Sequence, residues 1–358
     1  TGARGNNRYR RGGRKTPSFN PSQFINTNPT AVSVEVYKPK HSFTDFGLNK
    51  NVLRSLSALG IKNPSPIQDK IIPEILLGKD VIGLAETGTG KTAAFLLPII
   101  EKTIKDDRAQ TLILAPTREL AIQIDNELKM LARGLRIFSV VCVGGINIHP
   151  QIRALHRKNH FIIGTPGRIL DLIKRKDFLP SKVTTVVLDE ADRMLDMGFI
   201  GDIKSILSNT PRSRQTLFFS ATTTKEADGL VKDFMHDPIK ISVKKKDITD
   251  SIEQNVVMFD RSSKFETLLN LLGKEEFKRV LIFGSMKHSV EKLSRELFAK
   301  GIKAESIHGN KNHSQRQRAL EKFKNGKARV LVATDVAARG IHVDSVSHVI
   351  NYDLPSTF

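Results

Sequence analysis

Short apolar runs alternate with amphipathic stretches along most of this chain, and that alternation restricts the fold more than any other feature. The runs Asp80–Ala85, Gln110–Ala115 and Val183–Leu188 are predominantly apolar and have the length of strands buried on both faces. Between the last two, apolar residues recur at helical spacing, at Leu120, Ile124, Leu128 and Leu131. Strands that alternate with helices predict parallel sheets flanked by helices, which is an α/β fold.

The second half of the sequence echoes the first. Thr111–Thr117 resembles Val280–Met286, and Phe161–Arg168 resembles Val330–Ala337, with the same offset at both places. This spacing indicates a duplicated α/β domain.

Composition divides the chain further. Residues 1–40 lack hydrophobic periodicity, and their first fifteen carry six basic residues and no acid, so we expect a disordered tail. It is either an arm that tracks phosphates or a solubilising segment, and the sequence leaves both open. Residues 41–242 are expected to form the first domain, 243–250 a polar linker and 251–358 the second domain.

The charge balance favours a polyanionic partner. The formal net charge is +20 and the pI about 10.0, and nucleic acid is the commonest partner of so basic a protein. The single cysteine, Cys142, excludes an intrachain disulfide and lies in an apolar run, which predicts a buried strand residue. No apolar stretch approaches the roughly 20 residues that span a bilayer. We expect a monomer in a reducing, cytoplasmic compartment.

A phosphate loop follows the first apolar run. Ala85–Thr92 matches the pattern in which glycine-rich backbone and a helix N-terminus hold phosphates. Lys91 is expected to reach the β- and γ-phosphates of ATP, and the Thr92 hydroxyl to bind Mg²⁺. The remaining loop residues expected to contact the nucleotide are Thr87, Gly88, Thr89 and Gly90.

Two carboxylates end the run Val183–Leu188. Ligands of open α/β sheets bind at the carboxyl ends of strands, so Asp189 and Glu190 are expected at the same edge as the phosphate loop. Asp189 suits Mg²⁺, and Glu190 suits deprotonation of an attacking water.

These motifs resemble those of the DEAD-box RNA helicases, which are named for the residues found here at Asp189–Asp192. The similarity extends over residues 41–358. The sequence around His308 and Arg316–Leu320 resembles that of bacterial RhlE-type members. It implies two RecA-like domains, use of ATP and Mg²⁺, and single-stranded or short duplex RNA as partner. Further motifs that match in the family's order are Gly60–Gln68, Pro116–Ala121, Gly144–Gly145, Thr165–Arg168, Ser220–Thr222 and Ala333–Gly340.

The resemblance assigns roles to individual residues. Phe43, Ile61 and Gln68 would surround adenine, where an amide offers a donor and an acceptor that match adenine but not guanine. Asp192, Ser220 and Thr222 would couple hydrolysis to domain movement. The residues expected on the RNA backbone are Pro116, Thr117, Arg118, Gly145, Thr165, Pro166, Arg168, Gly309, Arg316 and Thr334. None of them is placed to read bases, so binding is expected to be independent of sequence.

Some positions depart from the family pattern. Ile61 replaces an aromatic residue, His313 a glutamine and His342 an aspartate. Family members also continue beyond Phe358 into an arginine-rich motif, so we expect an incomplete second domain that lacks the arginine finger. Such a chain should bind ATP and RNA weakly and hydrolyse ATP barely above background. A nucleotide-binding RNA clamp or chaperone with negligible turnover, and a DNA-directed motor, stay open as alternatives.

Overall fold

The computed structural model describes residues 25–27, 37–86, 88–222, 224–243, 252–260, 262–338, 343 and 345–353. By its contacts the chain divides into residues 1–34 with 245–267, and residues 35–244 with 268–358. Most of the expected tail and nearly all of the expected linker lie outside the described residues, as do Thr87 and His342.

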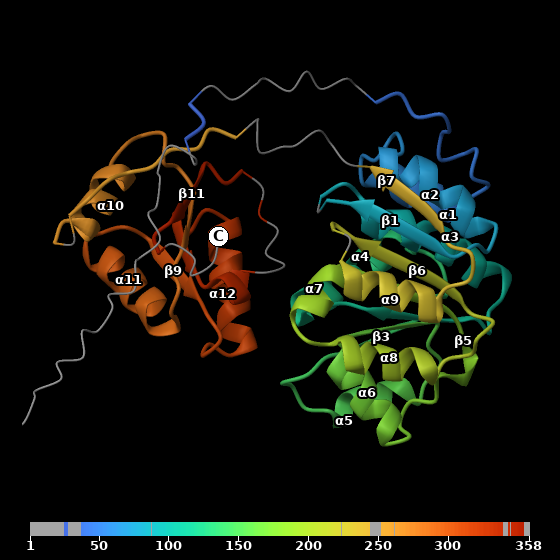
Figure 1. Ribbon diagram of the computed structural model, residues 1–358. Helices are drawn as coiled ribbons and strands as arrows, with labels where there is room; N and C mark the ends of the chain where they lie inside the picture. The colour runs from blue at the N-terminus through green and yellow to red at the C-terminus, as the bar shows by residue number, and fades with distance from the viewer. Residues whose placement is uncertain are drawn as a thin grey trace, which may run out of the picture. The chain divides into compact units, whose positions relative to one another are not determined.

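A seven-stranded parallel sheet forms the first half of the chain, in the order β3-β4-β2-β5-β6-β1-β7 (Figure 1). Its strands include each of the three apolar runs that the sequence marked. They are β1 (Val81–Ala85), β2 (Gln110–Leu114), β3 (Ser139–Cys142), β4 (Phe161–Gly164), β5 (Val183–Leu188), β6 (Gln215–Ser220) and β7 (Ile239–Val243). Every pairing between neighbours is parallel, so all seven strands end at one edge.

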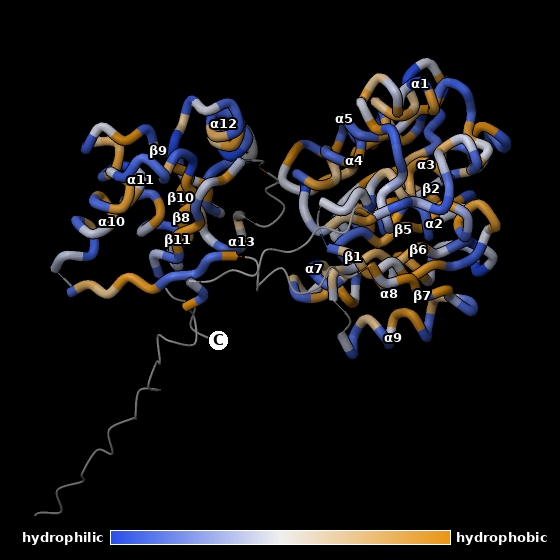
Figure 2. Tube along the Cα trace, turned by 90° about the horizontal axis from the view of Figure 1, so that it is seen from above, coloured by the Kyte–Doolittle hydropathy of each residue, from blue (hydrophilic) through white to orange (hydrophobic). Residues whose placement is uncertain are grey.

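Helices cover both faces of this sheet, as the alternation predicted (Figure 1). One face packs against α1 (Lys50–Ala58), α2 (Pro66–Leu76), α3 (Lys91–Lys105) and α4 (Arg118–Leu131). The opposite face packs against α5 (His149–Leu155), α6 (Pro166–Lys174), α7 (Ala191–Asp196), α8 (Ile200–Ser208) and α9 (Lys225–Phe234). A short 3₁₀ turn, Pro180–Lys182, leads into β5. Along the helices, hydrophobic and hydrophilic residues alternate (Figure 2), as expected where one side is buried.

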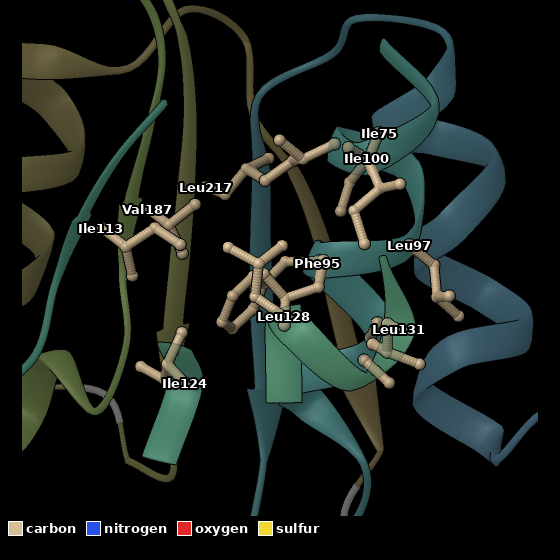
Figure 3. Packing of buried hydrophobic residues seen from close by; sticks show 14 of the residues in the cluster. Ile75, Phe95, Leu97, Ile100, Ile113, Ile124, Leu128, Leu131, Val187 and Leu217 are labelled. Atoms are coloured by element: carbon tan, nitrogen blue, oxygen red, sulfur yellow. The ribbon is translucent and has the colours of Figure 1, made fainter. Parts of the chain in front are cut away.

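Strand side chains alternate between the two cores. In β6, Leu217 and Phe219 enter the core under α1–α4, whereas Phe218 enters the opposite one. Figure 3 shows Val187 and Leu217 of the sheet opposite Leu128 of α4 and Phe95 of α3. The Phe95 and Phe219 rings lie 5.3 Å apart between centroids. Burial of large side chains on both faces fixes the register of the sheet, because a slip of one residue would exchange the cores.

A smaller parallel sheet forms the second half, in the order β11-β8-β10-β9. Its strands are β8 (Val280–Phe283), β9 (Ala304–Ile307), β10 (Val330–Ala333) and β11 (His348–Asn351), and its helices are α10 (Lys264–Leu272), α11 (Lys287–Ala299), α12 (His313–Lys324) and α13 (Asp335–Ala338). Its own core includes Phe323 of α12 and Leu331 of β10.

The internal echo corresponds to a shared topology. Read from β9, the smaller sheet runs β9-β10-β8-β11, the order of β3-β4-β2-β5 in the larger one. Ala115 donates its N–H to Gly164 O, and Gly284, its counterpart, donates to Ala333 O, both at 3.0 Å. The two halves therefore share strand order and register.

Residues just before the first helix are held by one carboxylate. Asp69, 2 % exposed, accepts hydrogen bonds from the Tyr37 hydroxyl (2.5 Å), the Lys40 N–H (2.8 Å) and the His41 N–H (3.1 Å). Burial acts to raise the pKa of Asp69, but these bonds hold it below its ordinary value. Residues 37–40, assigned to the tail from the sequence, are thus fixed to α2.

No helix among the described residues is long and apolar enough to cross a membrane. Cys142 is buried at the end of β3 as predicted, and burial raises its pKa to about 12.

Two glycines provide a test of the packing. A Cβ at Gly164, in β4, would overlap the carbonyl oxygen of Cys142 on β3, whereas a Cβ at Gly201, in α8, would meet nothing within 4 Å. Gly164→Ala should lower the free energy of unfolding by about 1–3 kcal/mol because the neighbouring backbone must shift. Gly201→Ala should be neutral or stabilising by up to about 1 kcal/mol. Urea unfolding measures both, and equal stabilities would contradict this register.

Candidate functional site

The phosphate loop joins β1 to α3 and holds its lysine in a buried position. Gly90 has a φ of 88° and precedes the first residue of α3, Lys91. The Lys91 ammonium donates to the Ala85 carbonyl at 2.9 Å, and the Thr89 hydroxyl to the Glu86 carbonyl at 2.8 Å. Lys91 is 7 % exposed, so its charge lies at the strand end rather than in solvent.

Asp189 and Glu190 follow β5 at the same edge of the sheet. Burial raises the pKa of Asp189 to about 6, while the charge of Lys91 acts in the opposite direction. Glu190 has a φ of 51°, in the left-handed region that a non-glycine residue rarely occupies, and its carboxylate pairs with Arg193 Nη1 at 2.5 Å. Backbone strain of this kind concentrates at functional sites.

A third carboxyl group, which the sequence analysis did not mark, belongs to this site. Burial raises the pKa of Glu127, on α4, to about 7; the Asp189 charge adds to the rise, and a hydrogen bond with the Thr92 side chain opposes it. Glu127 falls outside the Pro116–Ala121 motif, so only the α4 contacts reveal it. Arg193, which fixes the Glu190 side chain, was missed for the same reason.

The donors gathered here fit a hard divalent cation. A hydroxyl, Thr92, and the carboxyl groups of Asp189 and Glu127 are oxygen ligands of the kind Mg²⁺ prefers. Burial is the main cause that raises the pKa of both carboxyl groups; the charge of Asp189 adds to the rise for Glu127, and the charges of Glu190 and Asp192 add to it for Asp189. A bound cation would restore their ionised forms.

Asp192 links the acidic loop to the end of β6. Its Oδ2 accepts hydrogen bonds from the Ala221 N–H (3.1 Å), the Thr222 N–H (3.0 Å) and the Thr222 hydroxyl (3.0 Å). Buried Ser220 donates to the Thr222 carbonyl at 2.6 Å. The three residues to which the sequence assigned coupling thus form one network.

Gln68 joins α2 to the phosphate loop. Its Oε1 accepts the Ser65 N–H at 2.9 Å and its Nε2 donates to the Gly90 carbonyl at 3.1 Å. Ile61 is half-buried against the core, but Phe43 is 5 % exposed and its ring packs edge-on against Phe46. Phe43 is therefore a core residue in this structure, and it supports the loop before α1.

The first-half residues expected on RNA lie after β2, β3 and β4, beside the nucleotide group. Thr117 caps α4 by accepting the Leu120 N–H at 3.2 Å, and Pro116 is buried. The guanidinium of Arg118 lies against Gly145, whose φ of 72° and missing side chain permit the approach. Arg168 donates to the Ile146 carbonyl at 3.2 Å. Thr165 precedes Pro166 and makes no capping bond with its side chain.

In the second half, Gly309, Arg316 and Thr334 follow β9 and β10. Glu291 of α11 holds the loop after β9, accepting from the Ser306 hydroxyl at 2.5 Å and contacting His308 Nε2 at 3.1 Å. The Ser306 bond, with those of His308 and Arg295 and the charge of Lys311, lowers the pKa of Glu291 to about 2, against the effect of burial. Arg316 lies in the first turn of α12, which Asn312 caps.

The fold and this edge define the chain as a P-loop nucleotide-binding protein. The model of the DEAD/DEAH box helicases matches residues 65–230, and that of the helicase conserved C-terminal domain matches residues 263–358. The chain therefore belongs to the DEAD-box helicase family.

Curated proteins of similar sequence support the same family assignment. The chain is 47 % identical over 315 residues to the ATP-dependent RNA helicase CshA of Listeria monocytogenes, covering 87 % of this chain and 61 % of the relative. It is 45 % identical to CshA of Geobacillus kaustophilus, covering 88 % and 68 %. The chain thus spans about 60 % of the length of several curated relatives that it matches. The reported relatives carry the name CshA, so these comparisons support the family but not the finer similarity to RhlE-type members.

Solved structures give the same fold. A DEAD box protein from Methanococcus jannaschii matches with a TM-score of 0.55 at 39 % identity, covering 88 % of this chain and 86 % of that one. A hypothetical ATP-dependent RNA helicase from Sulfolobus tokodaii matches with a TM-score of 0.52 at 32 % identity, covering 86 % and 89 %. Two RecA-like domains, the expected architecture, are confirmed.

Glu127 makes the stability of the nucleotide-free protein depend on pH. The pKa of the Glu127 carboxyl group is about 7 in the folded state and 4.5 in the unfolded chain. The contribution of this group to the stability of the folded state is therefore fully present below pH 4.5 and is lost as the pH rises through 7. Glu127→Gln should therefore gain stability relative to the parent between pH 5 and pH 8, by roughly 3 kcal/mol at most. Urea unfolding without magnesium measures this, and a pH-independent difference would contradict it.

Proposed function

We propose that this chain is the ATP-driven core of an RNA helicase, which hydrolyses ATP to separate short RNA duplexes. One observation carries the proposal: Lys91, Asp189 and Glu190 lie buried at the carboxyl edge of one sheet, where burial raises the pKa of Asp189. A merely structural lysine or carboxylate would have no reason to be buried at the edge where α/β sheets bind ligands.

The phosphate-binding chemistry follows from the loop. Lys91 would exchange its bond with the Ala85 carbonyl for the β- and γ-phosphates, while backbone N–H groups at the start of α3 face the same anion. Thr92 and Asp189 would hold Mg²⁺, which when bound neutralises charge that develops on the phosphates.

Glu190 would accept a proton from the attacking water. Its φ of 51° turns the backbone at the start of α7, and the bond with Arg193 limits the side chain to one direction. A carboxylate held in this way acts as a general base without first losing rotational freedom. Asp192, two residues further on, would carry the state of the acidic loop to Ser220 and Thr222.

RNA would lie along the ends of β2, β3 and β4. Arg118 and Arg168 offer guanidinium groups for phosphates, and Thr165 has a hydroxyl that no capping bond uses. Contacts of this kind position a strand without reading its sequence. The glycine at 145 permits close approach of the backbone. We also propose that the chain is a monomer and that it acts in the cytoplasm; the free, buried thiol of Cys142 supports the second of these, because it fits a reducing compartment.

Two substitutions separate the roles of the nucleotide site. Lys91→Ala should abolish ATP turnover and weaken nucleotide binding, because it removes the charge that compensates the phosphates. Glu190→Gln should lower turnover by at least about 10²-fold and leave binding intact, because only the base is lost. RNA-stimulated phosphate release measures turnover; a fluorescent ATP analogue measures affinity.

The matched control is Lys79→Ala. Lys79 precedes β1 at the opposite edge of the sheet and pairs with Glu74 at 2.9 Å, so its loss should leave both measurements unchanged. If Lys91→Ala retained the parent turnover, the assignment of the phosphate loop would be wrong. Turnover that persists in Glu190→Gln would remove its role as the base.

RNA affinity should fall steeply with salt and vary little with sequence. Each phosphate contact adds about −0.7 to the slope of log affinity against log salt on single strands. Arg118→Ala and Arg168→Ala should each flatten that slope by about one contact. Arg175→Ala is the control, because Arg175 is exposed and paired with Asp171 at 2.7 Å. Equal slopes in all four proteins would contradict the proposed RNA track.

A further inference from the structure

A cavity of about 430 Å³ lies at the amino edge of the larger sheet, opposite the nucleotide site. The segments that lead into β1, β6 and β7 line it, and these strands are neighbours at one end of the sheet. Sites for small molecules in proteins commonly have volumes of about 300–1,000 Å³. The cavity therefore has room for a small molecule, and its lining contains no residue of the nucleotide site or of the proposed RNA track.

Asp80 holds the lining segments together. It is 5 % exposed, and its carboxylate accepts the Thr216 N–H and the His236 N–H, both at 2.7 Å. Its carbonyl accepts the Ile239 N–H at 2.9 Å. The residue before β1 is thus bonded to β6, to β7 and to the loop between α9 and β7. These bonds fix the walls of the cavity without help from a ligand.

Arg214 brings a buried cation to the same lining. It is 6 % exposed, and it donates from Nη1 to the Pro211 carbonyl at 3.0 Å and from Nη2 to the Phe234 carbonyl at 3.2 Å. Its Nε has no hydrogen-bond partner within the described ranges. Burial lowers the pKa of Arg214, and the charge of Asp80 offsets this only in part. Fewer than half of the guanidinium N–H groups thus have an acceptor, and an anion in the cavity would supply one.

Two charged side chains of opposite sign add to the exposed part of the lining. Arg212 is exposed, lies two residues before Arg214 and forms no ion pair with the residues that the structure describes. Asp237 is also exposed, and its φ of 40° lies in the left-handed region. The Lys79 ammonium is already paired with Glu74, at 2.9 Å. The unmatched groups of the lining are therefore the two guanidiniums and the Asp237 carboxylate.

We propose that this cavity binds a small molecule carrying one phosphate monoester and several hydroxyl groups, with the phosphate at Arg212 and Arg214 and a hydroxyl donating to Asp237. The planar fork of a guanidinium matches the oxygens of a phosphate. The cavity is larger than a phosphate ion requires, so the ligand has a body as well as an anionic group. The Asp237 carboxylate would repel a second phosphate, which disfavours polyphosphates and nucleic acid strands.

Ribose 5-phosphate is the probe, and isothermal titration calorimetry of the intact chain measures its binding. Arg212→Ala should weaken binding at least about fivefold, because charge-assisted hydrogen bonds to the phosphate are lost. The exposed position of Arg212 makes this variant a test of binding rather than of folding. Arg175→Ala, which removes an exposed arginine paired with Asp171, is the matched control and should bind like the parent. No binding by the parent, or equal affinity in Arg212→Ala, would overturn the proposal.

Asp237→Asn tests where the body of the ligand lies. Asparagine tolerates the left-handed backbone at this position, so the fold should be retained. The variant should bind ribose 5-phosphate at least about twofold more weakly than the parent, because a hydroxyl group donates less strongly to an amide than to a carboxylate. Binding of inorganic phosphate should not weaken, because it has no hydroxylated body. Ribose without phosphate should not bind. If inorganic phosphate bound as tightly as ribose 5-phosphate, the assignment of a hydroxylated ligand would be wrong.

Two further measurements exclude other sites for the phosphate. Lys91→Ala should leave binding of ribose 5-phosphate unchanged, because Lys91 lies at the opposite edge of the sheet. Loss of binding in Lys91→Ala, with binding retained in Arg212→Ala, would assign the phosphate to the phosphate loop and overturn the cavity. Single-stranded RNA should not displace the probe; displacement at low salt would show instead that the cavity belongs to a nucleic acid surface. None of these outcomes depends on helicase activity, so the cavity and the proposed function stand or fall separately.

Discussion

The whole arrangement depends on parallel pairing of the seven strands of the larger sheet. Because every strand of that sheet points the same way, every loop that follows a strand emerges at one edge. The loops after β1, β5 and β6 carry the phosphate loop, the acidic residues and Ser220–Thr222; those after β2, β3 and β4 carry the residues proposed for RNA. The strand order therefore places the nucleotide-site loops and the proposed RNA-contact loops in two neighbouring parts of one edge. The two parts meet where β5 lies beside β2. Packing of large side chains on both faces keeps that order from slipping.

Much of this fold could be predicted from the sequence because the strands are visible as short apolar runs. Runs such as Val183–Leu188 are apolar on both faces, and the helix through Leu120 and Leu131 has one apolar side, so local pattern and tertiary contact agree. The family resemblance then put Asp192 and Thr222 in the same site, although 30 residues separate them. The duplication was visible for the same reason: β8 and β10 repeat the apolar runs of β2 and β4.

Other features depend on contacts that no local pattern contains. Glu127 is one charged residue among several on α4, and only its approach to Thr92 and Asp189 makes it part of the site. Phe43 has the spacing of an adenine-stacking residue, and its burial in the core under α1 has no local signature in the sequence; its contact with adenine stays a prediction. The pairing of Asn26 with Gln254 joins segments without periodicity, where one hydrogen-bonded residue on each side leaves no signature.

The left-handed backbone at Glu190 has a consequence for how this position can change over time. A glycine there would relax the turn, since it alone occupies a φ of 51° without steric cost, and the folded state would gain stability. It would also remove the one carboxylate proposed as the base. Selection for a more stable fold would therefore favour glycine at position 190, whereas selection for turnover would favour glutamate. Inactive descendants of such a chain, freed from the second demand, would be expected to drift toward glycine or asparagine at this single site.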